Sequence, residues 1–328
     1  MRTNSTAAVQ EPLQVWKGDT LGRRFRKQLP FQIFVWLGLA FLLVFNYAPM
    51  FGVLIAFKNY KISTGISGIF TSEWVGLRYF RELVRDYNFP NLVRNTLALS
   101  VLKLVFSFPV PIILAIMLTE TRSAFMRRFV QTASYLPHFI SWVIVSGMAY
   151  AFFSTETGMI NNALMTLHII QEPIKILTDP NSFWGLAVAS AIWKEAGWWT
   201  IIFLAAISGI DPTQYEAAEM DGAGRLQRIW HVTLPGMKSA IIAVLILSIG
   251  SILGGGMVGS NFEQVMLLGN SLNNDKAQII QTYAFNVGLA QGRYAFAAAT
   301  DLIQSVIAVI LVVSANTIAK KVSGSSLY

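Results

Sequence analysis

Residues 211–235 read DPTQYEAAEMDGAGRLQRIWHVTLP, and this stretch decides how the rest of the chain is interpreted. Asp211 suits the N-cap of a helix, and Pro212 suits its first position because proline has no N–H to leave unsatisfied there. The following residues, up to 220, are good helix formers. Gly222 permits a tight turn. The stretch therefore predicts two short helices joined by a turn, the second of them stopped by Pro235.

Long apolar segments lie on both sides of this loop and recur through the chain. A helix needs about 20 mostly apolar residues to cross a membrane. Segments that meet this need are 31–57, 92–118, 135–153, 182–207, 238–258 and 300–318. Prolines and charged residues interrupt several of them, and neighbouring helices or a wet cavity can satisfy the groups that these flaws free. The sequence predicts an all-α, polytopic membrane protein with six transmembrane helices.

The composition supports a membrane class and excludes others. The chain is 54% hydrophobic and 13% charged, with a mean hydropathy of +0.52, whereas a soluble domain carries about 25% charged residues. The net charge of +8 comes without a basic face that interleaves aromatic residues, so nucleic acid is not expected as a partner. The absence of cysteine excludes disulfides, Cys-ligated zinc and thiol chemistry.

The distribution of Lys and Arg predicts the direction of the helices across the membrane. With the N-terminus in the cytoplasm, the inner segments hold 14 basic residues and the outer segments nine. Six of those nine lie in the first outer loop, 58–94, which weakens the bias without reversing it. The expected organisation is a cytoplasmic N-terminal tail (1–30), a six-span transmembrane domain (31–318, with the cytoplasmic loop 211–236) and a cytoplasmic C-terminal tail (319–328). The first apolar run is too long for a signal peptide.

The loop also carries a family resemblance. Glu216-Ala217-Ala218, then Gly222, then Val232-Thr-Leu-Pro235 resemble the coupling loop of ABC importer permeases, with Val232 where isoleucine is usual. Further segments resemble the maltose-type sugar permeases, above all their polysaccharide-permease branch and the membrane subunits of alginate importers. They are Gly158–Asn161, Trp193–Gly197, Asn261–Gln264 and Val287–Gly292.

The resemblance implies a type I ABC importer permease fold with a cytoplasmic coupling helix between spans four and five. It implies four partners: a second homologous permease subunit, two ATP-binding cassette subunits and an external solute-binding protein. ATP and magnesium would be bound by those ATPase subunits, and no cofactor is expected in this chain. Contact with the ATPase is carried over to Glu216, Ala217, Ala218, Gly222, Leu234 and Pro235. The chain would be a non-catalytic half of the pore in the bacterial inner membrane.

Two lysines within the predicted spans are candidates for the substrate pathway. A lysine at a helix centre costs about 2.5–3.5 kcal/mol on insertion scales, so Lys103 and Lys194 are not expected to face lipid. They could line a polar path for an anionic sugar, or else reach the surface or pair within the bundle. Glu195 is adjacent to Lys194 and points about 100° away on a helix, so these two side chains are not expected to face each other.

Aromatic and glycine-rich segments complete the candidate pathway. Trp193 and Trp198 could stack on sugar rings, although an interfacial belt or helix packing explains them equally simply. Gly254 and Gly255 favour a break or hinge at the end of span five. Asn261, Glu263 and Gln264 follow that break. The segment formally matches GxGxxG, but no βαβ unit surrounds it, so a dinucleotide site is rejected.

Other functions fit the sequence less well. The three histidines lie far apart without metal-ligand spacing, and the chain contains no GxxxxGK[ST] motif. A gradient-driven secondary transporter should show inverted repeats, a membrane enzyme should cluster His, Asp, Glu or Ser in its spans, and an exporter half should carry an ATPase domain. We therefore expect ATP-driven import of an oligosaccharide or polysaccharide, an acidic alginate-like one above all.

Overall fold

The computed structural model describes residues 21–254 and 261–323. It divides into two units, 1–52 and 53–328, whose relative placement is not defined. In the first unit α1 (Leu21–Leu42) continues through η1 (Leu43–Tyr47) into α2 (Ala48–Met50). The apolar side chains of this unit, such as Phe31 and Phe34, are largely exposed, as expected for a helix that faces lipid or another subunit.

The second unit is helical over its described residues, where the strand-like pairing is confined to one antiparallel bridge between Lys58 and Trp74. Its elements up to the predicted loop are η2 (Phe51–Phe57, which begins in the first unit), η3 (Ile62–Thr64), α3 (Gly68–Thr71), α4 (Arg78–Arg85), α5 (Phe89–Leu102), η4 (Lys103–Ser107), α6 (Pro109–Glu120), α7 (Ala124–Tyr135), η5 (Leu136–Phe139), α8 (Trp142–Phe153), α9 (Met159–Thr166) and α10 (Pro180–Ser208). The remaining ones are α11 (Pro212–Met220), α12 (Arg225–Arg228), η6 (Ile229–Thr233), α13 (Leu234–Gly236), α14 (Lys238–Gly254), α15 (Asn261–Leu268), α16 (Asn274–Ala277), α17 (Ile280–Ala290) and α18 (Tyr294–Ser323).

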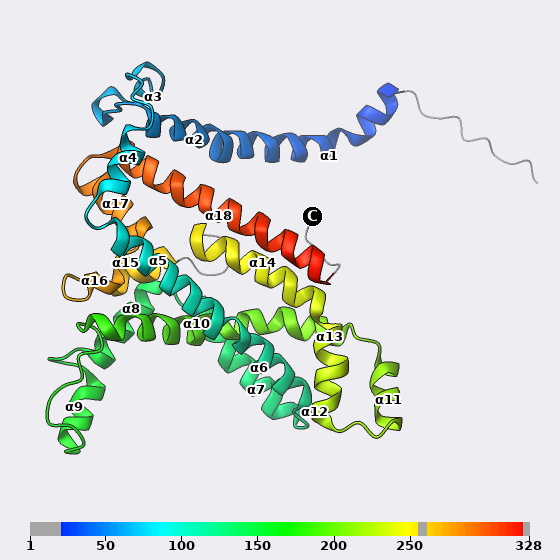
Figure 1. Cartoon of the computed structure of the whole chain (residues 1–328). Coiled ribbons are helices and arrows are strands. Elements are labelled where there is room, and N and C mark those ends of the chain that lie inside the picture. The colour runs from blue at the N-terminus through cyan, green and yellow to red at the C-terminus, as the bar shows by residue number, and fades with distance from the viewer. Residues whose placement is uncertain (1–20, 255–260, 324–328) are drawn as a thin grey trace, which may run out of the picture. The chain divides into compact units, whose positions relative to one another are not determined.

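Helix α10 is the central element of the second unit (Figure 1). It begins with Asp179, whose carboxylate accepts a hydrogen bond from the Asn181 N–H, and with Pro180 at the first helical position. It packs against α6, α7, α14 and α16. Its buried residues Phe183 and Phe203 belong to two different apolar clusters of the core. The long helix therefore ties both ends of the unit together.

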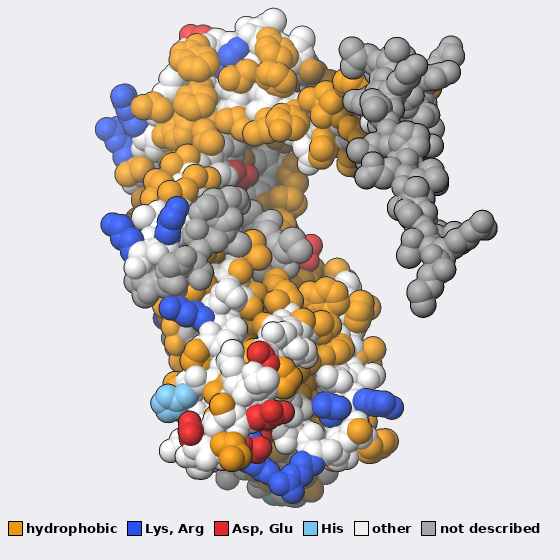
Figure 2. Space-filling model, turned by 90° about the vertical axis from the view of Figure 1, so that its right-hand side faces the viewer, with side chains coloured by type: hydrophobic (Ala, Val, Ile, Leu, Met, Phe, Trp, Pro, Cys, Tyr) orange, Lys and Arg blue, Asp and Glu red, His pale blue; other side chains and the backbone are white. Residues whose placement is uncertain are grey.

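The helices confirm part of the predicted span pattern. Three are long and apolar enough to cross a membrane: Phe31–Phe57, Phe89–Glu120 and Tyr294–Lys321. Two bent pairs, Ala124–Phe139 with Trp142–Phe153 and Arg225–Gly236 with Lys238–Gly250, raise this to five. The predicted span 182–207 lies within α10, which is long enough but is not among these five. Figure 2 shows the broad exposed apolar surface that a membrane protein presents.

The prediction of a single span over 135–153 was wrong in its geometry. The chain bends by 102° between α7 with η5 and α8. Two local signals produce this bend: Pro137 lies in a short 3-10 turn, and Ser141 caps α8 by accepting the Ile144 N–H. A capped helix start cannot also be the interior of a longer helix, so α8 is a separate element.

Candidate functional site

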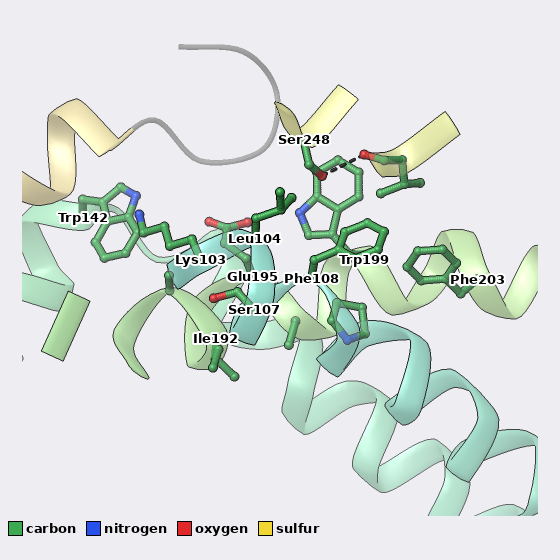
Figure 3. A pocket seen from close by; sticks show the side chains of 14 residues that line it. Lys103, Leu104, Ser107, Phe108, Trp142, Ile192, Glu195, Trp199, Phe203 and Ser248 are labelled. Carbon is green, nitrogen blue, oxygen red and sulfur yellow. Dashed lines mark hydrogen bonds between the residues drawn. The ribbon is translucent and has the colours of Figure 1, made fainter. Parts of the chain in front are cut away.

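A cavity of about 60 Å³ lies beside the middle of α10, where η4, α6, α8 and α14 meet it (Figure 3). Its wall is mostly apolar and aromatic, with a few polar groups among them. The polar and aromatic side chains of the wall include Lys103, Ser107, Trp142, Glu195, Trp199 and Ser248. An apolar cavity with a few convergent polar groups is the usual form of a small-molecule site.

Lys103 begins the wide turn η4 and lines this cavity, with only 6% of its surface exposed. The Glu195 carboxylate is close enough to act on it electrostatically. Within the part of the chain that the structure describes, its ammonium makes no hydrogen bond or ion pair. Ser107 Oγ and Trp199 Nε1 line the same cavity and are buried without a hydrogen-bond partner. Unsatisfied donors of this kind carry a large desolvation penalty, so a ligand that accepts hydrogen bonds would be favoured there.

Lys194 is buried as well, but its partners are complete. Its Nζ donates to the His138 backbone carbonyl at 2.9 Å and lies 3.2 Å from Glu195 Oε1. It also lies 5.6 Å from the centroid of the Trp142 ring, within cation–π range. Of the two readings left open by the sequence, the structure favours pairing within the bundle for Lys194.

The expectation that Lys194 and Glu195 do not face each other was wrong. Their Cα–Cβ bonds do diverge on the helix, but both side chains are long enough to curl toward η5. Both side chains contact His138: its Nδ1 lies 2.8 Å from Glu195 Oε2, and its backbone carbonyl accepts a hydrogen bond from Lys194 Nζ. The His138 ring also stacks on Trp198, with centroids 4.4 Å apart and planes 5° from parallel. We call this cluster of His138, Lys194, Glu195 and Trp198 the α10 clamp.

The clamp holds the bend between α7 and α8 against α10. Gly197 lies one helical turn from Lys194, and there the backbones are so close that a Cβ would meet the Ser134 carbonyl oxygen at 2.0 Å. Glycine is therefore required at this position by close approach. His138, Trp142 and Gly197 were not predicted as site residues, because no local pattern indicates which helices will touch.

The other candidate pathway residues are dispersed. Trp193 is 46% exposed and does not line the cavity. Gln264 is fully buried, and its amide donates to the Ala187 carbonyl at 2.7 Å and to Ser190 Oγ at 2.8 Å, which joins α15 to α10. Asn261 is buried and Glu263 is exposed. Gly254 is the last residue of α14, and Gly255 lies outside the described residues.

The predicted helix–turn–helix is present at residues 211–236. Asp211 caps α11 by accepting the Thr213 N–H at 3.0 Å, and this hydrogen bond lowers the pKa of the Asp211 carboxyl. Gly222 forms the turn with a φ of +79°, which L residues with a side chain rarely adopt. An ion pair between Arg228 and Glu219 and a hydrogen bond between Tyr215 and Thr233 join the two helices.

The second helix ends one residue after Pro235 and before α14, close to the prediction. The helical path of α12, η6 and α13 passes through Pro235 and ends at Gly236, and a 62° bend separates it from α14. The widened turn η6 just before the proline makes room for its ring.

The loop has an exposed surface with several large apolar side chains. Glu216 and Ala217 are exposed, and Ala218 and Gly222 border a groove of about 300 Å³. Met220, Leu226 and Trp230 are 89%, 72% and 67% exposed. Exposed apolar patches of this kind are typical of protein interaction sites. Of the other loop residues carried over, Leu234 is half-buried and Pro235 is exposed.

Comparison with known proteins places the chain in a family. Residues 107–324 match the family described as binding-protein-dependent transport system inner membrane component. The chain belongs to this family. It is therefore a permease component of a sugar ABC transporter, located in the inner membrane, and a transport component by class rather than a catalytic subunit. The gradient-driven alternative is set aside.

Relatives and solved structures agree with this assignment. Protein LplB of Bacillus subtilis is 48% identical over 89% of this chain and 88% of its own length. The polygalacturonan/rhamnogalacturonan transport system permease protein YteP of the same organism is 44% identical over the same shares. A chain of a bacterial ABC transporter that imports the acidic polysaccharide alginate superposes with a TM-score of 0.82, at 35% identity over 92% of this chain and 99% of that one. A second structure, bound to a periplasmic protein carrying an alginate pentasaccharide, also gives 0.82, at 36% identity over 94% and 99%.

Proposed function

We propose that this chain forms half of the translocation pathway of an ATP-driven, binding-protein-dependent importer for acidic oligosaccharides. The observation that carries the proposal is the cavity beside α10, where the ammonium of Lys103 has no ion-pair partner among the described residues. A carboxylate of a uronic acid would complete this site, since charge-assisted hydrogen bonds are about twice as strong as neutral ones. The aromatic wall from Trp142 and Trp199 suits a sugar ring.

The substrate class follows from this chemistry and from the relatives. YteP is named for polygalacturonan and rhamnogalacturonan, and the matching structures belong to an importer of alginate. These are acidic polysaccharides. Lys103 would select their carboxylates, whereas Lys194 would serve to hold the α10 clamp together.

The cavity implies alternating access. A volume of about 60 Å³ holds only a few water molecules, so a sugar would enter only after the surrounding helices separate. Helix α10 runs from this cavity to Ser208, and α11 begins at Pro212. A displacement of the loop 211–236 would therefore be passed directly to Glu195 and its clamp.

The proposed assembly has a second homologous permease subunit, two ATP-binding cassette subunits that bind ATP and magnesium, and an external solute-binding protein. The ATPases would contact the surface around Glu216, Ala217, Ala218 and Gly222. ATP binding would close them, open the cavity outward for the sugar, and hydrolysis would reset it. In this proposal the chain crosses the bilayer six times, with α10 as the fourth span and both termini in the cytoplasm.

The test is sugar uptake by the complete complex reconstituted in vesicles. A uronate oligosaccharide and its carboxyl-reduced, neutral analogue are compared in the wild type and in Lys103→Met. Loss of one charge-assisted contact, worth about 1.5–3 kcal/mol, should raise the half-saturating uronate concentration by about 10–100-fold and leave the neutral sugar unaffected. Lys175→Met, at an exposed loop lysine, is the matched control.

Three results would contradict the proposal. Equal handling of both sugars by the wild type would refute an acidic substrate. Wild-type uronate uptake by a variant with Met at both Lys103 and Lys194 would refute the role of charge in the cavity. Purification of the chain without a companion ATPase would refute the assembly itself.

A further inference from the structure

Helix α4 (Arg78–Arg85) has one buried side and one exposed side. The acidic residues next to the buried side are paired within the protein: the partly exposed Glu82 forms an ion pair with Arg293, and Asp86, just beyond the helix, accepts a hydrogen bond from the Tyr283 hydroxyl. Between them Leu83 is completely buried in an apolar cluster with Val287 and Phe296. This buried side packs against α17 and α18.

The side of the helix turned away from Leu83 carries three arginines, with Glu82 next to them but paired to Arg293. Arg78, Arg81 and Arg85 are exposed, and at about 100° per residue they fall within about 60° of one another around the helix. Arg78 lies 6.0 Å from the ring of Tyr79. Within residues 21–254 and 261–323 the three guanidinium groups have no acidic partner. They make a row about 10 Å long at 1.5 Å per residue.

Exposed apolar groups border this row. Val84 follows about 60° beyond Arg81 around the helix and is 59% exposed. Near the ends of the helix Leu77 is 54% exposed, and Tyr87 is 92% exposed. Neither a sugar chain nor water would bury the aliphatic side chains of Val84 and Leu77. A basic row beside an apolar edge with an aromatic residue is the pattern of a helix that lies in a membrane interface.

The position of α4 fixes it at the level of the lipid headgroups. It ends at Arg85, and the candidate span Phe89–Glu120 begins four residues later. Its Glu82 is paired with Arg293, the residue directly before the candidate span Tyr294–Lys321. Two spans therefore enter the membrane beside α4, whichever side of the membrane this is.

We propose that α4 is an interfacial helix whose arginine row, Arg78, Arg81 and Arg85, binds the phosphate headgroups of anionic lipids while Val84 and Leu77 dip toward the acyl chains. This inference depends on membrane insertion alone, so it is independent of the transported substrate. It also explains why basic residues accumulate in the loop 58–94, against the usual bias. Lipid phosphates at this level supply the counter-charge that the described protein residues lack.

The test uses one spin label, because the natural chain has no cysteine. The complete complex carrying Val84→Cys, labelled with a nitroxide, is placed in vesicles of phosphatidylcholine alone or mixed with phosphatidylglycerol. Accessibility of the label to oxygen, which concentrates in the bilayer, is compared with accessibility to a water-soluble nickel chelate. Glu172→Cys, in an exposed loop, gives the aqueous reference, and Val309→Cys, exposed on α18, gives the membrane reference.

The Val84 label should lie between the two references and move toward the membrane reference when phosphatidylglycerol is added. In the Arg78→Gln, Arg81→Gln, Arg85→Gln background this response should disappear, since each basic residue near an anionic surface contributes a preference of about fivefold. Lysine at the same three positions should preserve it. The matched control, Arg122→Gln, Arg127→Gln, Arg128→Gln, removes the same charge elsewhere on the surface and should leave the response intact.

A label at Val84 that matches Glu172→Cys in both kinds of vesicle would overturn the proposal. So would an equal loss of the response in the control variant. If the label becomes protected only when the solute-binding protein is added, α4 is a docking surface for a soluble protein, and the lipid assignment is wrong.

Discussion

The contact between Gly197 and the end of α7 gives a sharp test of how the candidate site is held together. A Cβ at Gly197 would lie 2.0 Å from the Ser134 carbonyl oxygen, 2.3 Å from the Ser134 carbonyl carbon and 2.8 Å from the Tyr135 nitrogen. All three are backbone atoms, so no side chain can turn aside. Ordinary contact begins at 3.4 Å, and Gly197→Ala must therefore separate α7 from α10 by about 1.4 Å, as overpacking forces backbone shifts.

A shift of that size would break the α10 clamp. The Lys194 Nζ bond to the His138 carbonyl is 2.9 Å long, and His138 Nδ1 lies 2.8 Å from Glu195. Lengthening either by more than about 0.6 Å takes it beyond hydrogen-bonding distance. Overpacking alone costs about 1–3 kcal/mol, and a buried lysine left without its partner adds a further penalty.

The matched control is Gly185→Ala in the same helix, where a Cβ would meet nothing within 4 Å. That change should stabilise α10, because alanine is favoured over glycine in a helix by about 1 kcal/mol. Thermal unfolding of the complex and hydrogen exchange of residues 124–139 measure both effects. Gly197→Ala should lower the midpoint and speed exchange in this segment, and Gly185→Ala should do neither. Equal behaviour of the two variants would refute the close-approach argument.

Three further outcomes are expected. Gly222→Ala should cost about 1 kcal/mol through backbone strain alone, because a Cβ there meets no atom within 4 Å; Gly222→Asn, which tolerates positive φ, should cost less in the same chemical denaturation assay. Because the pKa of Asp211 is lowered in the fold, its capping contribution is present above its unfolded pKa and lost as pH falls through its folded pKa; the protection factor of the Thr213 amide against hydrogen exchange should fall there, and Asp211→Asn should remove that pH dependence. Gln264→Leu should destabilise the complex by about 1–3 kcal/mol, since it leaves the Ala187 carbonyl and Ser190 hydroxyl without their donor, and an unchanged midpoint would contradict this.

The sequence predicted best what local chemistry decides. The N-cap at Asp211, the proline at the first position and the turn at Gly222 all depend on residues within a few positions of one another, and the structure confirms each. The family resemblance was confirmed as well. The apolar runs predicted helices at the right places, because hydropathy reports burial or lipid contact without any knowledge of partners.

The features that were predicted wrongly or missed depend on contacts between segments that lie far apart in the sequence. The angle between neighbouring side chains on a helix excluded a pair between Lys194 and Glu195, yet His138, 56 positions before Lys194, draws both together. Likewise no periodicity distinguishes Gly197, pressed against Ser134, from Gly185 in open space. Such contacts follow from tertiary packing, which a single sequence does not encode locally.

The prolines within the predicted spans are accommodated by a local change in the helix that the sequence did not predict. The described residues contain three widened turns, Leu43–Tyr47, Lys103–Ser107 and Ile229–Thr233, and each ends two residues before a proline. In each, the residue before the proline donates its N–H five positions back, as Phe108 does to the Lys103 carbonyl at 3.2 Å.

A proline in a helix clashes with the carbonyl four residues earlier, and in all three cases that carbonyl lies in the middle of the widened turn. The extra residue gives the ring its space, so the helix continues. Widened turns are frequent at functional sites, and here one of them carries Lys103 and Ser107, which both line the cavity. We conclude that Pro109, which reads as a flaw in the span, accounts for the widened turn that places Lys103 in the wall of the cavity.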